Sequence, residues 1–98
     1  MNEYRNSSGH LTYDFESVKI KDYMKICKKV VEHFKLKEND QLVHGLDETF
    51  QEYSLGSFVI GLEWDIWSGY IVVAKNKKSE ALAKEISQFI NEIFNKNT

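Results

Sequence analysis

The 98-residue chain contains no proline, one cysteine and five glycines. A single cysteine, Cys27, excludes an intrachain disulfide, which argues against a small secreted disulfide scaffold. No apolar run approaches the roughly 18 residues of a membrane-spanning helix, and the N-terminal residues do not form an apolar signal segment. We therefore expect a cytoplasmic protein with no membrane association, folded as one domain over residues 1–98.

Motifs of catalysis and metal binding are also missing. The sequence has no phosphate-binding glycine loop, no dinucleotide fingerprint and no nucleophile elbow. Its three histidines, His10, His33 and His44, are scattered, and none has a second ligand at a metal-binding spacing. Cys27 falls within an apolar helical stripe, so we expect a buried core thiol rather than a nucleophile. The expectation is a protein without catalytic residues, metal or cofactor.

Basic residues are absent from the middle of the chain. Residues 38–74 contain no lysine or arginine, whereas both flanking segments are net positive and the whole chain carries a charge of −2. The acids of this middle segment are Glu38, Asp40, Asp47, Glu48, Glu52, Glu63 and Asp65. Such a segment repels phosphates, so we expect no nucleic acid as partner. It suits a basic protein, because charge attraction sets association rate and specificity.

Two segments have the spacing of amphipathic helices. Apolar residues recur every three or four positions over residues 21–34 and again over residues 80–94, so each segment has one apolar stripe. Ser79 precedes the second segment and is a plausible N-cap, with Glu80 in the first turn.

Four segments have the pattern of strands. They are residues 11–15, residues 48–54 with a short strand or bend before them at 42–46, residues 57–65 and residues 70–75. The predicted fold is α+β with two layers. An antiparallel sheet of about four strands, in the chain order β-α-β-β-β-α, is covered by two helices on one face.

The other sheet face is the candidate site. Phe58, Ile60, Leu62 and Trp64 share the face turned to the helices, so Glu63 and Asp65 point the opposite way, about 7 Å apart. The candidate partner-binding residues are Asp47, Glu48, Glu52, Glu63, Asp65 and Trp67. A merely solvated strand face is the simpler reading. Trp67 fits an interface anchor or a partly buried turn residue equally well. Paired acids also occur in glycosidases, but a sugar-binding cleft is not expected in so short a chain.

Two segments resemble a known class of proteins. They are residues 45–53, which read GLDETFQEY, and residues 62–75, which read LEWDIWSGYIVVAK. They look like small bacterial immunity proteins of polymorphic toxin and contact-dependent growth inhibition systems, and the resemblance extends over about residues 45–90. It implies a cytosolic inhibitor that binds the C-terminal toxin domain of a cognate secreted effector, often a nuclease. The alternative is a non-enzymatic adaptor or a homodimeric binding module.

Overall fold

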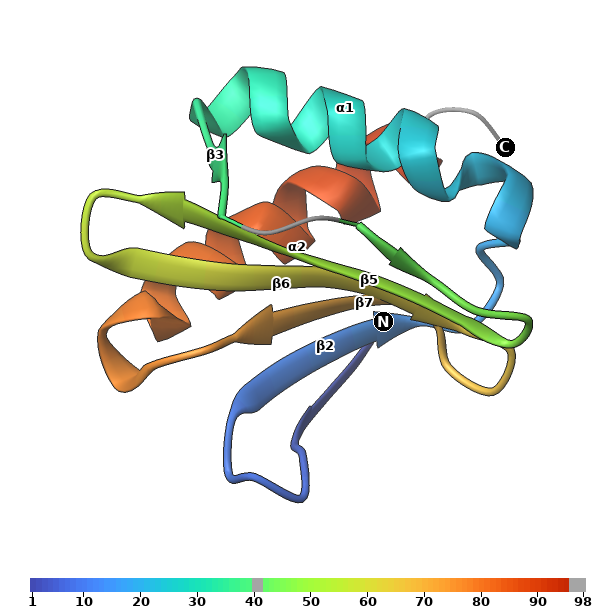
Figure 1. Cartoon of the computed structure of the whole chain (residues 1–98), viewed down its shortest axis with the longest axis horizontal. Coiled ribbons are helices and arrows are strands. Elements are labelled where there is room, and N and C mark those ends of the chain that lie inside the picture. The colour runs from blue at the N-terminus through green and yellow to red at the C-terminus, as the bar shows by residue number, and fades with distance from the viewer. Residues whose placement is uncertain (40–41, 96–98) are drawn as a thin grey trace.

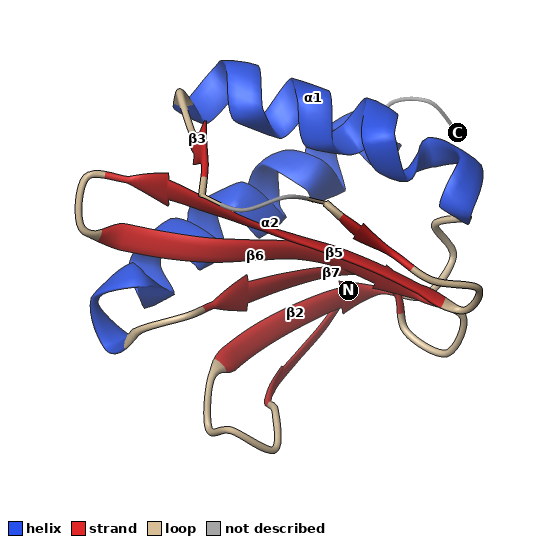
Figure 2. Ribbon diagram, viewed as in Figure 1, coloured by secondary structure: helices blue, strands red, loops and turns tan. Residues whose placement is uncertain are grey.

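The structure, a computed structural model, describes residues 1–39 and 42–95 and has two helices packed on one face of an antiparallel sheet (Figures 1 and 2). The predicted α+β class is therefore confirmed. The predicted number of about four strands is too low, because the sheet has seven strands within the described residues. The elements are β1 (Asn2–Arg5), β2 (Leu11–Phe15), α1 (Tyr23–Phe34), β3 (Lys37–Glu38), β4 (Val43–His44), β5 (Glu48–Leu55), β6 (Phe58–Asp65), β7 (Gly69–Ala74) and α2 (Glu80–Asn95).

The strands follow the order β1-β2-β7-β6-β5-β3, and β4 also pairs with β5. The additional strands lie at the two edges of the sheet. In β1 all four side chains are exposed, so this strand has no buried alternation by which a sequence pattern reveals a strand. Strands β3 and β4 have two residues each, and β4 falls inside the short strand or bend expected at 42–46.

The core lies between the sheet and the helices. Ile60 and Leu62 of β6 are fully buried, as the strand pattern predicts, and so are Ile86 and Ile90 of α2. Trp64 is partly buried on the same side of the sheet, and its Nε1 donates a hydrogen bond of 2.9 Å to the carbonyl oxygen of Val18. Burying each aliphatic side chain of this kind contributes roughly 1.5–3 kcal/mol.

Cys27 lies in this core beside tyrosine hydroxyls. Its Sγ atom is 3.1 Å from the hydroxyl of Tyr70, and the hydroxyl of Tyr23 donates to the carbonyl oxygen of Leu62. Burial raises the pKa of the Cys27 thiol to about 11, so the protonated thiol dominates at neutral pH. The prediction of a buried core thiol is confirmed.

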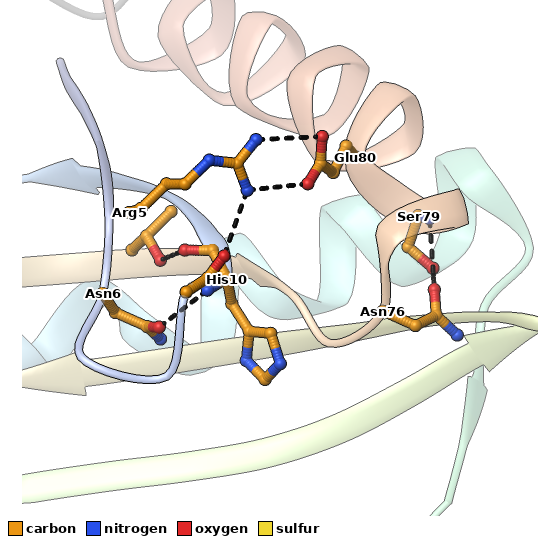
Figure 3. A network of polar contacts seen from close by, with 8 residues as sticks. Arg5, Asn6, His10, Asn76, Ser79 and Glu80 are labelled. Atoms are coloured by element: carbon orange, nitrogen blue, oxygen red, sulfur yellow. Dashed lines mark hydrogen bonds and ion pairs between the residues drawn. The ribbon is translucent and has the colours of Figure 1, made fainter.

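Hydrogen bonds satisfy backbone N–H and carbonyl groups at the end of α1 and just before α2. Lys35 takes a left-handed conformation with φ of 60° after α1, and the N–H of Leu36 donates to the carbonyl oxygen of Val31. A short 3-10 helix, Lys77–Ser79, leads into α2, and its N-cap is Asn76, whose side-chain oxygen accepts from the N–H of Ser79 at 3.1 Å (Figure 3). The predicted N-cap Ser79 is therefore wrong. Its hydroxyl accepts instead from the N–H of Val59, at 2.7 Å, which ties α2 to the sheet.

Candidate functional site

The register of β5 and β6 determines which acids share a face. Glu48 pairs with Asp65, and Phe50 pairs with Glu63. Glu48, Glu52, Glu63 and Asp65 therefore lie on the sheet face turned away from the helices, and we call these four residues the acidic face. Phe50, whose side chain is exposed, stands between Glu48 and Glu52 along β5. Parity along β6 predicts the shared face of Glu63 and Asp65, and the β5–β6 register of the structure adds Glu48 and Glu52 to it. Asp40, another acid of the middle segment, lies outside the described residues.

One carboxylate of the acidic face is neutralised. The Nζ of Lys75, the residue that directly follows the segment without bases, donates to Oε2 of Glu63 at 2.9 Å. The lysine reaches Glu63 over Gly61, where a Cβ atom would lie 2.6 Å from Cε of Lys75 and 2.8 Å from Oε2 of Glu63. The acids form a stretch without bases in the sequence, but not on the folded surface.

A second carboxylate stabilises a turn. Oδ1 of Asp65 accepts hydrogen bonds from the N–H groups of Trp67, at 3.0 Å, and Ser68, at 2.6 Å. The turn between β6 and β7 is thereby held in one conformation. Trp67 projects from it with 72% of its surface exposed. Trp67 lies in the turn but is exposed rather than partly buried, and its role as an interface anchor stays a prediction.

The neighbouring turn between β4 and β5 presents further apolar surface. The N–H of Ile66 donates to the carbonyl oxygen of Asp47 at 3.1 Å, so the two turns lie side by side at one end of the sheet (Figure 1). Leu46 is fully exposed at 102%, and Ile66 is half exposed at 52%. We call Leu46, Ile66 and Trp67 the apolar tip. Sequence reasoning missed Leu46 and Ile66, although an apolar residue in a short turn is a signal in itself.

The predicted site residues Asp47, Glu48 and Glu52 differ in how far their side chains are exposed to solvent. Asp47 and Glu48 are exposed next to the apolar tip, and Glu52 is half-buried. The side-chain amide of Asn39 donates to Oε1 of Glu52 at 3.2 Å, which leaves the glutamate its full charge. Free negative charge is therefore concentrated on Asp47, Glu48 and Glu52, beside a rigid apolar tip.

On the β1 and β2 side of the same sheet face, the one acidic side chain of β2 is buried and hydrogen-bonded within the fold. Asp14 is buried there and accepts a hydrogen bond of 2.8 Å from the side-chain amide of Asn2. Burial and the charge of Asp14 raise the pKa of the Tyr4 hydroxyl. Because Asp14 is satisfied within the fold, it adds little to the surface that a partner meets.

A polar pocket of about 370 Å³ lies at the other end of the molecule, between the β1–β2 loop and the start of α2 (Figure 3). Nη1 of Arg5 donates to Oε2 of Glu80 at 2.8 Å and to the carbonyl oxygen of Gly9 at 3.0 Å. Hydrogen bonding to Arg5 lowers the pKa of Glu80. Figure 3 shows the His10 ring pointing away from this pair. Because Arg5 is already engaged, the contacts fasten the β1–β2 hairpin to α2 rather than form a reactive centre.

Comparison of the chain with protein-family models, curated proteins and solved structures finds no match. Within residues 1–39 and 42–95, no three His, Cys, Asp or Glu side chains are grouped so that they could hold a metal ion. None of the described helices has the length and apolar character needed to cross a membrane.

Proposed function

We propose that this protein is an immunity protein that binds and neutralises the C-terminal toxin domain, a nuclease, of a cognate secreted effector. The observation that carries the proposal is the gathering of Glu48, Glu52, Glu63 and Asp65 on one sheet face. The contact surface comprises this acidic face together with Asp47 and Trp67. The bound partner is basic, because a nuclease gathers lysine and arginine side chains around the phosphates of its substrate.

The carboxylates act in place of those phosphates. Glu48 and Glu52, two residues on either side of Phe50, offer negative charge around an apolar ring. A guanidinium or ammonium group bound there gains both charge attraction and contact with the ring face. Glu63 contributes less charge because Lys75 is bonded to it. The strongest attraction is therefore expected from Asp47, Glu48 and Glu52.

The apolar tip supplies the anchor. The backbone of Trp67 is held by the hydrogen bonds that Asp65 accepts in this turn, so ordering the turn on binding costs little backbone entropy. Exposed tryptophans in rigid positions are frequent hot spots of protein interfaces. A partner with an apolar pocket inside a basic rim matches this combination of Trp67, Leu46 and the adjoining acids.

The alternative of a homodimer joined through the open sheet face is disfavoured by charge. A two-fold interface brings the same patch of both copies together, so the carboxylates of one acidic face would lie against those of the other. An adaptor that binds a basic partner other than a toxin uses the same surface, and a growth assay distinguishes it from an immunity protein.

That assay starts with a partner captured from the source cells on the immobilised chain and identified by mass spectrometry. If the partner is a toxin domain, its expression alone arrests bacterial growth, and co-expression of this protein restores growth. Restored growth with wild-type protein and arrest with the double variant E48K/E52K support the proposal. A partner that is harmless when expressed contradicts the immunity function and leaves the adaptor.

A further inference from the structure

An apolar groove of about 290 Å³ lies between the start of α1 and strand β4. It is lined by Ile20, Tyr23, Met24, Leu42, His44 and Thr49. Ile20, Met24 and Leu42 leave much of their surface exposed, and Met24 reaches 54%. His44 and Thr49 are cross-strand neighbours on the helix side of the sheet, joined by a hydrogen bond of 2.6 Å. The groove is therefore separate from the acidic face, which lies on the opposite side of β5.

Exposed lysines stand near the helical residues that line this groove, and we call these lysines its rim. Lys21 and Lys28 stand three residues before and four residues after Met24, which places all three on one side of the helical segment. Lys19 precedes Ile20, and the three lysines are exposed. In the part of the chain that the structure describes, the ion pairs involve other lysine and arginine residues. An apolar groove with this rim fits an apolar side chain flanked by carboxylates.

The chain itself displays such a side chain next to the groove. Leu46 follows His44 by two residues and is fully exposed, so it does not fill the groove of its own molecule. Asp47 and Glu48 come directly after it. Two hydrogen bonds hold this turn, from the N–H of Gly45 to the carbonyl oxygen of Glu48 at 2.7 Å and from Ile66 to Asp47. We call the Leu46 side chain on this hydrogen-bonded turn the knob. It is apolar like the groove, and the carboxylates beside it are opposite in charge to the lysines beside the groove.

We infer that two copies of this chain associate, with Leu46 of each copy inserted in the groove of the other. Asp47 and Glu48 then face Lys21 and Lys28 across the interface. Because knob and groove are adjacent on one edge, a two-fold axis between them satisfies both contacts at once, which gives a closed dimer. The inference does not rest on the proposed function. A partner that covers Asp47 and Glu48 competes with this dimer.

The test measures self-association by sedimentation equilibrium and by dilution of isotope-labelled protein in NMR. The wild-type chain is expected to dimerise, and the NMR signals of Ile20, Met24, Leu42 and Leu46 shift together on dilution. Leu46→Ser removes the knob and Met24→Gln damages the groove while keeping a good helix former. Each is expected to weaken dimerisation at least tenfold. Leu55→Ser, an equal apolar loss at the far turn of β5, is the matched control and leaves dimerisation within twofold.

A mixture distinguishes the knob-in-groove arrangement from other dimers. L46S retains a groove and M24Q retains a knob, so the mixed dimer has one intact contact and forms more readily than either variant does alone. Three results overturn the inference: a wild-type chain that stays monomeric at millimolar concentration, a dimer that neither variant weakens, or a mixture no more associated than its components. Binding of foreign acidic peptides by a chain that does not self-associate also overturns it.

Discussion

The Nζ atom of Lys75 lies 2.9 Å from Oε2 of Glu63 and thereby divides the acidic face into a neutralised part and a charged part. Both side chains are mostly shielded from solvent, with 31% and 24% of their surface exposed. A partly exposed ion pair of this kind contributes up to about 1 kcal/mol to stability. Its larger effect is on recognition, because it leaves Glu48 and Glu52 as the uncompensated charges of the face.

Replacing Lys75 by methionine keeps most of the aliphatic stem but removes the ammonium group. The free energy of unfolding is expected to fall by no more than about 1 kcal/mol, as measured by urea denaturation. Affinity for the basic partner is expected to rise several-fold in calorimetry, since Glu63 becomes uncompensated. Lys84→Met, on the exposed side of α2, produces the same change in net charge and serves as control. Equal gains from both variants would mean that only net charge matters.

Gly69 is the glycine that the fold needs most. Its φ is +73°, and a Cβ atom there would lie 2.1 Å from the carbonyl oxygen of Phe15, a backbone atom that cannot move aside. Gly69→Ala is therefore expected to destabilise the chain by about 2–4 kcal/mol. Gly56→Ala is the matched control, because its φ is +60° but no atom lies within 4 Å of the added carbon. It is expected to cost about 1 kcal/mol. Similar losses in thermal unfolding would contradict the backbone clash.

Cys27 is expected to react slowly with thiol reagents in the folded chain. Burial raises its pKa from an ordinary value of 9.0 to about 11, so the reactive thiolate is scarce at pH 8 and the sulfur is inaccessible. The measurement compares alkylation rates at pH 8 with and without denaturant. Rapid labelling of the native chain would contradict a buried thiol.

The same shift predicts how stability depends on pH. The folded pKa lies above the unfolded one, so this contribution to stability is complete below pH 9 and is lost between about pH 9 and 11. Burial also raises the pKa of Tyr70 and adds to the alkaline loss. Cys27→Ala removes the contribution of the thiol and also the part of the Tyr70 pKa shift that Cys27 causes, so the alkaline loss is expected to be smaller in this variant. An unchanged slope of unfolding free energy against pH in this variant would contradict the assignment.

Much of the fold follows from periodic patterns. The stripes of both helices and the alternation along β6 predict the buried residues Ile60, Leu62, Ile86 and Ile90, because packing on one side demands apolar residues at fixed spacing. Strand β1 escapes such reasoning. Its four residues are exposed, and it is held by backbone pairing with β2, which leaves no trace in side-chain character.

The candidate site could be predicted only in part. Alternation along one strand places Glu63 and Asp65 on the open face, and this holds in the structure. The pairing of Glu63 with Lys75 depends on the register between β6 and β7, which a single sequence does not reveal. The apolar tip depends in the same way on two turns meeting in space. The hydrogen bonds that Asp65 accepts could have been predicted from the sequence, because an aspartate just before a tight turn commonly accepts hydrogen bonds from the N–H groups of the turn.

The acidic face as a binding surface for a basic protein is tested most directly by measuring the dissociation constant of the purified partner by calorimetry. The chain is compared as wild type, as E48K/E52K and as E85K/E92K, whose reversed charges lie at exposed positions of α2. We predict that E48K/E52K weakens binding at least hundredfold, because two close charge pairs become repulsive, and that E85K/E92K changes it less than threefold. Equal affinity of E48K/E52K and wild type, or an equal loss of affinity in both double variants, would contradict the acidic face as the binding surface.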